Sequence, residues 1–284
     1  MRIDRYEYRD RADRLIAFFE AAARRDSQAE RKRRLFGRLA IGLGLASCMG
    51  LGPANGLIAV GLIALGLRDS LARGIGGFAL APLAIAAVVC AVLWNKHRQH
   101  DLDNRKLWAV LRVLKALRAD VPRGTPMRLK VDFRDYQRAE LRGKTGDAAS
   151  YHQTWLEAET TLADESRLRL SLTDDVRRKE RRKRKYTKVR ERLASEALFE
   201  VRPAGRYGDA AAIAARLQAT PAPQGLSLSS ATARGRWLRV VLETPPARRV
   251  TGRGGSATMT GALADADTLL RGLRFVWAGF RSSA

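Results

Sequence analysis

The chain has 284 residues, with 53 Lys and Arg against 29 Asp and Glu, a formal net charge of +24 and a pI near 11.2. A basic excess of this size favours an anionic partner, which could be phospholipid, nucleic acid or an acidic protein, without choosing among them. The two cysteines, Cys48 and Cys90, lie in apolar stretches. Nothing therefore indicates a disulfide framework, and both are expected to be unpaired, buried thiols.

The N-terminal segment has the pattern of an amphipathic helix. From Arg9 to Arg34 an apolar stripe is formed by Leu15, Phe18, Phe19 and Ala22, with charged residues elsewhere. No short apolar core with a cleavage site is present, so the segment does not resemble a secretory signal. Residues 1–38 are predicted to be a retained cytoplasmic helix.

Two apolar runs follow and predict a transmembrane helical hairpin over residues 39–94. Residues 39–67 carry no charge, and as a helix they would reach about 43 Å, more than the roughly 30 Å hydrocarbon core. Residues 75–94 match one crossing and end at Trp94, a residue suited to the interface. A turn signal at residues 52–56 leaves open whether the first run is one kinked span or a span with an interfacial piece.

The flanking charges predict the orientation of this hairpin. Basic residues at 31–34 and at Lys96 and Arg98 lie outside the two runs, which places both termini in the cytoplasm of a bacterium, with the hairpin in the plasma (inner) membrane. Small residues recur four apart, at Gly42, Ala46 and Gly50 and at Gly52 and Gly56. They favour close packing within the hairpin, and homo-oligomerisation through the same faces is the alternative.

Residues 95–122 are predicted to form a helical neck. An apolar seam recurs at spacings of three and four, made of Leu107, Val110, Leu114, Leu117 and Val121. We expect this seam to pack on the N-terminal helix, with a coiled-coil contact to a second chain as the alternative.

Residues 123–284 are predicted to be a basic cytoplasmic α+β domain. Alternation predicts strands at 127–133 and 168–172, weaker candidates at 151–162 and 189–201, and a further strand at 237–243; helices are predicted at 209–219 and 262–280, and a flexible loop at 247–261. The fold class is therefore α+β: a transmembrane hairpin with cytoplasmic helical extensions, then an antiparallel β-rich domain with a C-terminal helix.

The densest candidate site is a basic run. Its predicted anion- or lipid-surface-binding residues are Arg177, Arg178, Lys179, Arg181, Arg182, Lys183, Arg184, Lys185 and Lys188. Arg190 and Arg192 continue the run. Each cation near anionic lipid gains about 1 kcal/mol. A solvated hairpin tip without a ligand is the simpler interpretation, and nucleic acid is disfavoured because only Tyr186 lies close by as a stacking aromatic.

Other motifs do not support catalysis. Gly143-Lys144-Thr145 has Arg138 where a phosphate-binding loop needs glycine. Residues 252–256 are interpreted as a flexible loop.

His97 and His100 lie one turn apart near Asp101 and Asp103 but lack the further ligands of a closed metal site. The remaining histidine, His152, completes no catalytic set. The acidic pairs Asp164/Glu165 and Asp174/Asp175 resemble turn residues.

The sequence therefore predicts a non-enzymatic, membrane-anchored scaffold or interaction protein without cofactor or metal. Its basic domain would contact anionic phospholipid or an acidic protein. A membrane-tethered regulator that binds nucleic acid is the alternative.

Overall fold

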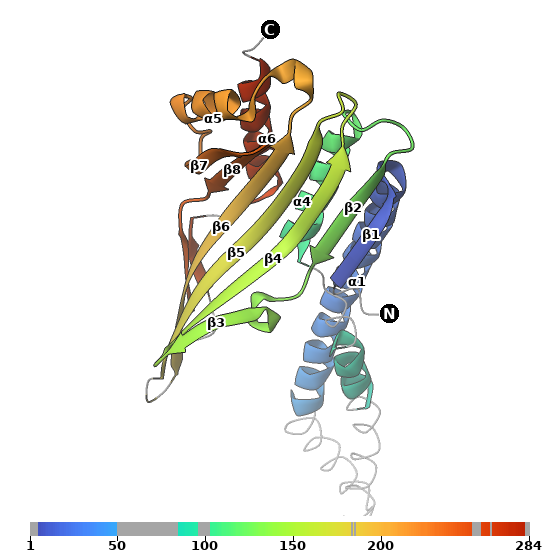
Figure 1. Ribbon diagram of the computed structural model, residues 1–284. Helices are drawn as coiled ribbons and strands as arrows, with labels where there is room; N and C mark the ends of the chain where they lie inside the picture. Colours follow the sequence, from blue (N-terminus) through green and yellow to red (C-terminus); the bar gives the residue numbers. More distant parts are fainter. Residues whose placement is uncertain are drawn as a thin grey trace, which may run out of the picture. The chain divides into compact units, whose positions relative to one another are not determined.

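The computed structural model describes residues 5–49, 85–95, 103–182, 184, 186–251, 257–261 and 263–281. Contacts divide the chain into two compact units, residues 1–21 with 102–284 and residues 22–101. The first unit holds an antiparallel sheet and ends in a helix (Figure 1). The predicted α+β class with an antiparallel sheet and a C-terminal helix is confirmed.

Ten strands of the described ranges form one sheet, in which neighbouring strands pair antiparallel. They are β1 (Arg5–Arg11), β2 (Pro126–Asp132), β3 (Glu140–Thr145), β4 (Ala148–Thr161), β5 (Arg167–Arg182), β6 (Thr187–Arg202), β7 (Ser227–Arg234), β8 (Trp237–Glu243), β9 (Ala247–Thr251) and β10 (Ala257–Thr260). The main order is β1-β2-β4-β5-β6-β8-β7. In addition β3 pairs with β4, β9 with β6, and β10 with β9.

Helices cover one face of this sheet. The elements are α1 (Ala12–Met49), α4 (Asn104–Arg118), α5 (Ala210–Ala219) and α6 (Ala266–Arg281), with 3-10 turns η2 (Tyr136–Arg138) and η3 (Gly205–Tyr207). In Figure 1, α4 and α6 lie behind the sheet, on the same side. We call the face that they cover the inner face and the opposite one the outer face.

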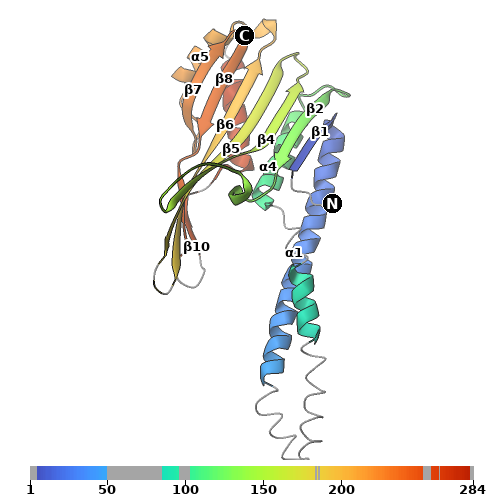
Figure 2. The ribbon, with the colours of Figure 1, turned by 60° about the horizontal axis from the view of Figure 1, so that its bottom comes forward.

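The long strands β4, β5 and β6 run through two halves of the sheet. We call the half in which they are flanked by β2 and β8 the β8 half, and the half in which they are flanked by β3 and β9 the β9 half. Figure 2 shows β10 beside the far end of β5 and β6. Side chains alternate between faces along each strand, so the inner face of the β8 half is apolar, with residues such as Leu168, Leu170 and Leu172 buried.

The apolar seam predicted in the neck is buried, with four of its residues on α4 and Val121 just after it. Asp103 caps this helix by accepting hydrogen bonds from the backbone amides of Arg105 and Lys106. All five seam residues are at most 9% exposed. Two ion pairs join α4 to the start of α1, Lys115 Nζ to Glu20 Oε1 at 2.7 Å and Arg118 Nε to Asp13 Oδ1 at 2.6 Å. Within its unit, α4 thus belongs to the core beside the sheet.

Five strands were not expected from the sequence: β1, β3, β7, β9 and β10. β1 precedes α1 and pairs with β2, so the helix begins at Ala12 and not at Arg9. The predicted loop at 247–261 is wrong where it is described, because β9 and β10 extend the sheet beside β6. Pairing with β9 gives hydrogen-bond partners to backbone groups in the first half of β6 that would otherwise lack them.

The prediction of a multi-pass protein of the bacterial inner membrane is wrong, because no helix in the described ranges is long and apolar enough to cross a membrane. Charged residues occupy α1 up to Arg38, so its charge-free part, residues 39–49, spans about 16 Å. The helical segment 85–95 has the same length, against the roughly 30 Å required. Most of the two predicted spans, at residues 50–84, lies outside the described residues.

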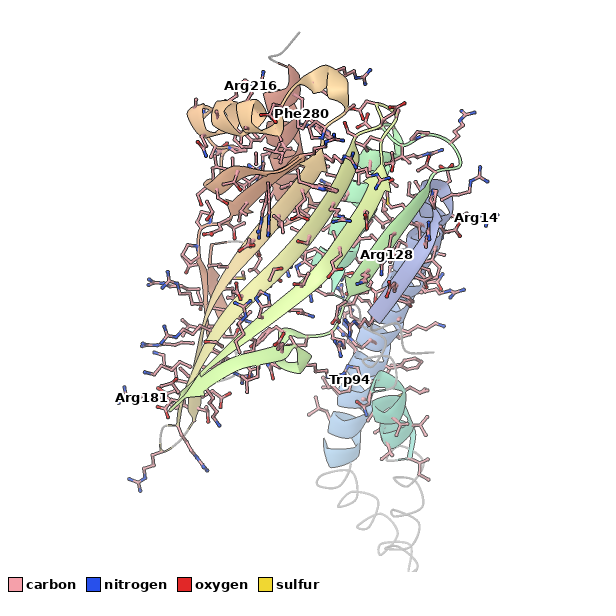
Figure 3. All side chains as sticks on the ribbon, in the orientation of Figure 1. Arg14, Trp94, Arg128, Arg181, Arg216 and Phe280 are labelled. Carbon is pink, nitrogen blue, oxygen red and sulfur yellow. The ribbon has the colours of Figure 1, made fainter. Side chains whose placement is uncertain are left out.

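The second unit contains the rest of α1 and the helical segment 85–95. A Cβ on Gly37 would lie 3.2 Å from Cδ1 of Trp94, so the indole, labelled in Figure 3, packs on this glycine. A Cβ on Gly42, in contrast, would meet no neighbouring atom within 4 Å. Cys90 is a free, half-buried cysteine. The predicted packing through Gly50, Gly52 and Gly56 falls outside the described residues.

Close packing of α5 and α6 predicts a stability effect. A Cβ at Gly279 would lie 2.8 Å from Leu217 Cδ2, so Gly279→Ala is expected to lower the free energy of unfolding by about 1–3 kcal/mol. Gly42→Ala is the control, expected to stabilise α1 by up to about 1 kcal/mol because the position is open. Chemical denaturation measures both. Equal effects of the two substitutions would contradict the close packing.

Candidate anion-binding face

The predicted basic run lies at the end of the β5–β6 hairpin. Arg177, Arg178, Lys179, Arg181 and Arg182 are on β5, Arg184 is in the turn and Lys188 is on β6, while Lys183 and Lys185 lie outside the described residues. Figure 3 places Arg181 at the far end of the β9 half. Most of the predicted residues are thus brought together, but strand alternation distributes them over two faces.

One set of cations shares the outer face, and we call it the basic face. Its members are Arg177, Lys179, Arg181, Lys188, Arg190, Arg192 and Arg248. All are exposed except Lys188, which is half-buried. Arg248 was not part of the predicted site, because its place beside Arg192 depends on the unforeseen strand β9. Lys188, Arg190 and Arg192 already alternate in the sequence, which is a signal for a shared face.

These cations stand opposite one another in cross-strand rows. Arg177 pairs in register with Arg192, which pairs with Arg248 on β9. The next rows join Lys179 to Arg190 and Arg181 to Lys188. Like charges directly opposite each other destabilise a sheet. The fold therefore holds these rows at a cost in stability.

The outer face of the β8 half contains a row of charges with the opposite pattern. One row across five strands alternates in sign: Arg128, Glu159, Arg169, Glu200, Arg239. Arg169 Nε lies 3.0 Å from Glu159 Oε1, and Lys130 Nζ lies 3.2 Å from Glu157 Oε2. This row differs from the cationic rows of the β9 half, where no opposite charge stands in register.

Two arginines on the inner face of the β9 half have acidic neighbours. Arg178 forms an ion pair with Glu180, and Arg249 Nη1 lies 3.9 Å from Oε2 of the buried Glu191. The Tyr136 hydroxyl donates a hydrogen bond to Glu191. Burial and this bond raise the pKa of Tyr136 well above its ordinary value. This inner cluster is an internally paired network, unlike the basic face.

A cluster of His152, Arg142 and Asp175 borders the basic face. His152 Nδ1 lies 2.8 Å from Asp175 Oδ1, and His152 Nε2 lies 2.9 Å from Arg142 Nη2. Because a guanidinium only donates, Nε2 accepts and Nδ1 carries the proton that is donated to Asp175. Both ring nitrogens are therefore engaged, and the arrangement lacks the free base that nucleophilic catalysis requires.

Buried polar groups near the start of α4 have a structural role. Lys106 Nζ donates to the backbone carbonyls of Asp132 and Arg134, at 3.3 and 2.9 Å, and to Gln153 Oε1 at 3.0 Å. Burial lowers the pKa of Lys106. Asp174, which the sequence placed in a turn, is instead buried in β5, where it accepts hydrogen bonds from Arg105 and from Ser195 Oγ.

The remaining motifs do not form sites in the described ranges. Gly143-Lys144-Thr145 lies in β3, which is not the strand-loop-helix context of a nucleotide loop. His97, His100 and residues 252–256 fall outside the described residues, and Asp103 is a helix cap. No group of three or more potential metal ligands occurs in the part of the chain that is described.

Comparison with known proteins finds no matching family model, no matching curated protein and no matching solved structure. Function must therefore be inferred from this chain's own geometry. The feature that departs most from ordinary folding requirements is the basic face.

Proposed function

We propose that this chain is a non-catalytic binding protein whose basic face contacts an anionic phospholipid surface. The observation that carries the proposal is the arrangement of seven cations in cross-strand rows on one face of the β9 half. The β8 half also holds like-charged pairs, Arg167 with Arg202 and Glu196 with Glu243, but the β9 half joins three neighbouring cationic rows on one face.

The spacing of the rows suits a repeated anion. Side chains two residues apart on a strand project to the same face about 7 Å apart, and neighbouring strands lie about 5 Å apart. Lys179 and Arg181 thus extend the array along β5, while Arg192 and Arg248 extend it across the sheet. Such an array can contact several phosphates at once.

The one-sided placement favours a surface over a nucleic acid. On the inner face Arg178 and Arg249 have acidic neighbours and Arg182 is exposed, so the denser array of cations is on the outer face. Single strands are usually held by stacking aromatics, and Tyr186 at the turn is 37% exposed but stands alone there.

Contact of this kind needs no spanning helix. Each Lys or Arg near an anionic leaflet contributes about 1 kcal/mol, so seven residues would suffice for salt-sensitive binding. The proposal therefore stands independently of the transmembrane prediction, which was wrong.

Replacing Lys179, Arg181 and Arg190 by serine in the full chain is expected to weaken binding to phosphatidylglycerol vesicles by roughly 100-fold, at about 1 kcal/mol per cation. Cosedimentation in low salt measures this. The matched control replaces Arg128, Lys130 and Arg239 by serine, which removes the same charge from the outer face of the β8 half. This control should bind within about threefold of the parent, because its cations already face carboxylates.

Several outcomes would overturn the proposal. Equal losses in the two triple variants would show that net charge and not the basic face drives binding. A parent chain that binds no anionic vesicle would rule out the lipid surface. Tighter binding to an oligonucleotide than to vesicles at equal phosphate would reassign the face to nucleic acid.

A further inference from the structure

One row of the basic face differs from the others. Arg177, Arg192 and Arg248 stand in register on three adjacent strands, whereas the other two rows hold two cations each and include lysine. Residues directly opposite in such pairs have Cβ atoms about 5 Å apart. Three guanidinium groups can therefore converge on one small group above β6.

The surroundings leave these three arginines unneutralised. The nearest acid along β5 on the same face is Asp175, and its carboxylate is engaged by His152 Nδ1 at 2.8 Å and lies 3.8 Å from Arg142 Nη1. The residue opposite Arg177 on β4 is Ser150, a neutral hydroxyl. No acidic side chain in the described ranges forms an ion pair with any of the three.

We infer that this row is a binding site for a phosphomonoester group. The inference rests on the proposed function and names the headgroup that the face selects. A phosphomonoester offers three free oxygens and about −1.5 to −2 charges near neutral pH, whereas a phosphodiester offers two free oxygens and one charge. Each arginine presents a planar fork that binds two phosphate oxygens. Three forks together match the monoester better than the diester.

The test compares phosphatidic acid vesicles, which carry a monoester, with phosphatidylglycerol vesicles of equal measured surface charge. The full chain is expected to prefer phosphatidic acid by about tenfold, the effect of one added charge-assisted hydrogen bond. Arg192→Lys keeps the charge but removes the fork at the centre of the row. It should abolish most of the preference, measured as the ratio of the two affinities, so that any loss of binding shared by both vesicles cancels.

Arg181→Lys is the matched control, because it makes the same replacement in a row of two cations. It should keep the preference of the parent. Equal affinity of the parent for both vesicles, or an Arg192→Lys variant that retains the preference, would overturn this inference alone. Binding to neither vesicle would overturn the proposed function and this inference with it.

Discussion

Asp174→Ala is expected to lower the free energy of unfolding by about 3–5 kcal/mol, because it leaves a largely buried arginine without its counter-charge. The Asp174 side chain is 5% exposed and that of its partner Arg105 is 22% exposed. Ser195 Oγ, 2.7 Å from Asp174 Oδ1, would also lose its acceptor. Arg105 Nη1 further donates to the Ala264 carbonyl at 3.1 Å, so the loss should loosen the segment before α6.

Asp175→Ala provides the control at the next position of the same strand. Its side chain faces outward and is 47% exposed, so removing it should change stability by less than about 1 kcal/mol. Urea unfolding followed by circular dichroism measures both variants. Similar stability losses would show that Asp174 is not a buried partner of Arg105.

Leu114→Asp is expected to destabilise the chain by more than about 4 kcal/mol, because it puts a carboxylate without a partner into the core. Leu114 is 1% exposed on α4. Phe19, which belongs to the neighbouring start of α1, is fully buried. A variant that fails to fold agrees with this expectation, and milder Leu114→Ala should then cost about 2–5 kcal/mol.

Trp108→Asp on the same helix distinguishes burial from helix propensity. Trp108 is 56% exposed, so this substitution introduces the same residue into α4 with little desolvation. Thermal unfolding should place it close to the parent and far above Leu114→Asp. If both variants unfold together, the apolar seam of α4 is not the buried side of the helix.

Much of the sheet could be predicted because its strands alternate cleanly. The expected strand at 237–243 matches β8, and the expected helix at 209–219 matches α5 to within one residue. β9 and β10 could not be found from their own sequence, since these short, polar segments are held by pairing with a neighbour. β1 was missed because its alternation runs directly into the charged start of α1.

The candidate site was predicted in part for the same reason. A run of charges is visible in the sequence, but its division between two faces depends on strand geometry. Arg248 lies 56 positions from its neighbour Arg192, and Asp175 lies 23 from His152, so only strand register brings each pair together. The apolar runs misled the prediction because hydropathy alone assigned them to a bilayer.

The continuity of β5 and β6 through both halves ties surface charge to core packing. In the β8 half, Leu170 opposite Phe199 locks these strands in one alignment, since both side chains are buried. A slip by one residue would turn every side chain to the other face. The apolar end of the hairpin therefore dictates which way Arg177 points several residues later. Outward positions at the charged end can consequently change in evolution, and alter ligand preference, without any change in the core that orients them.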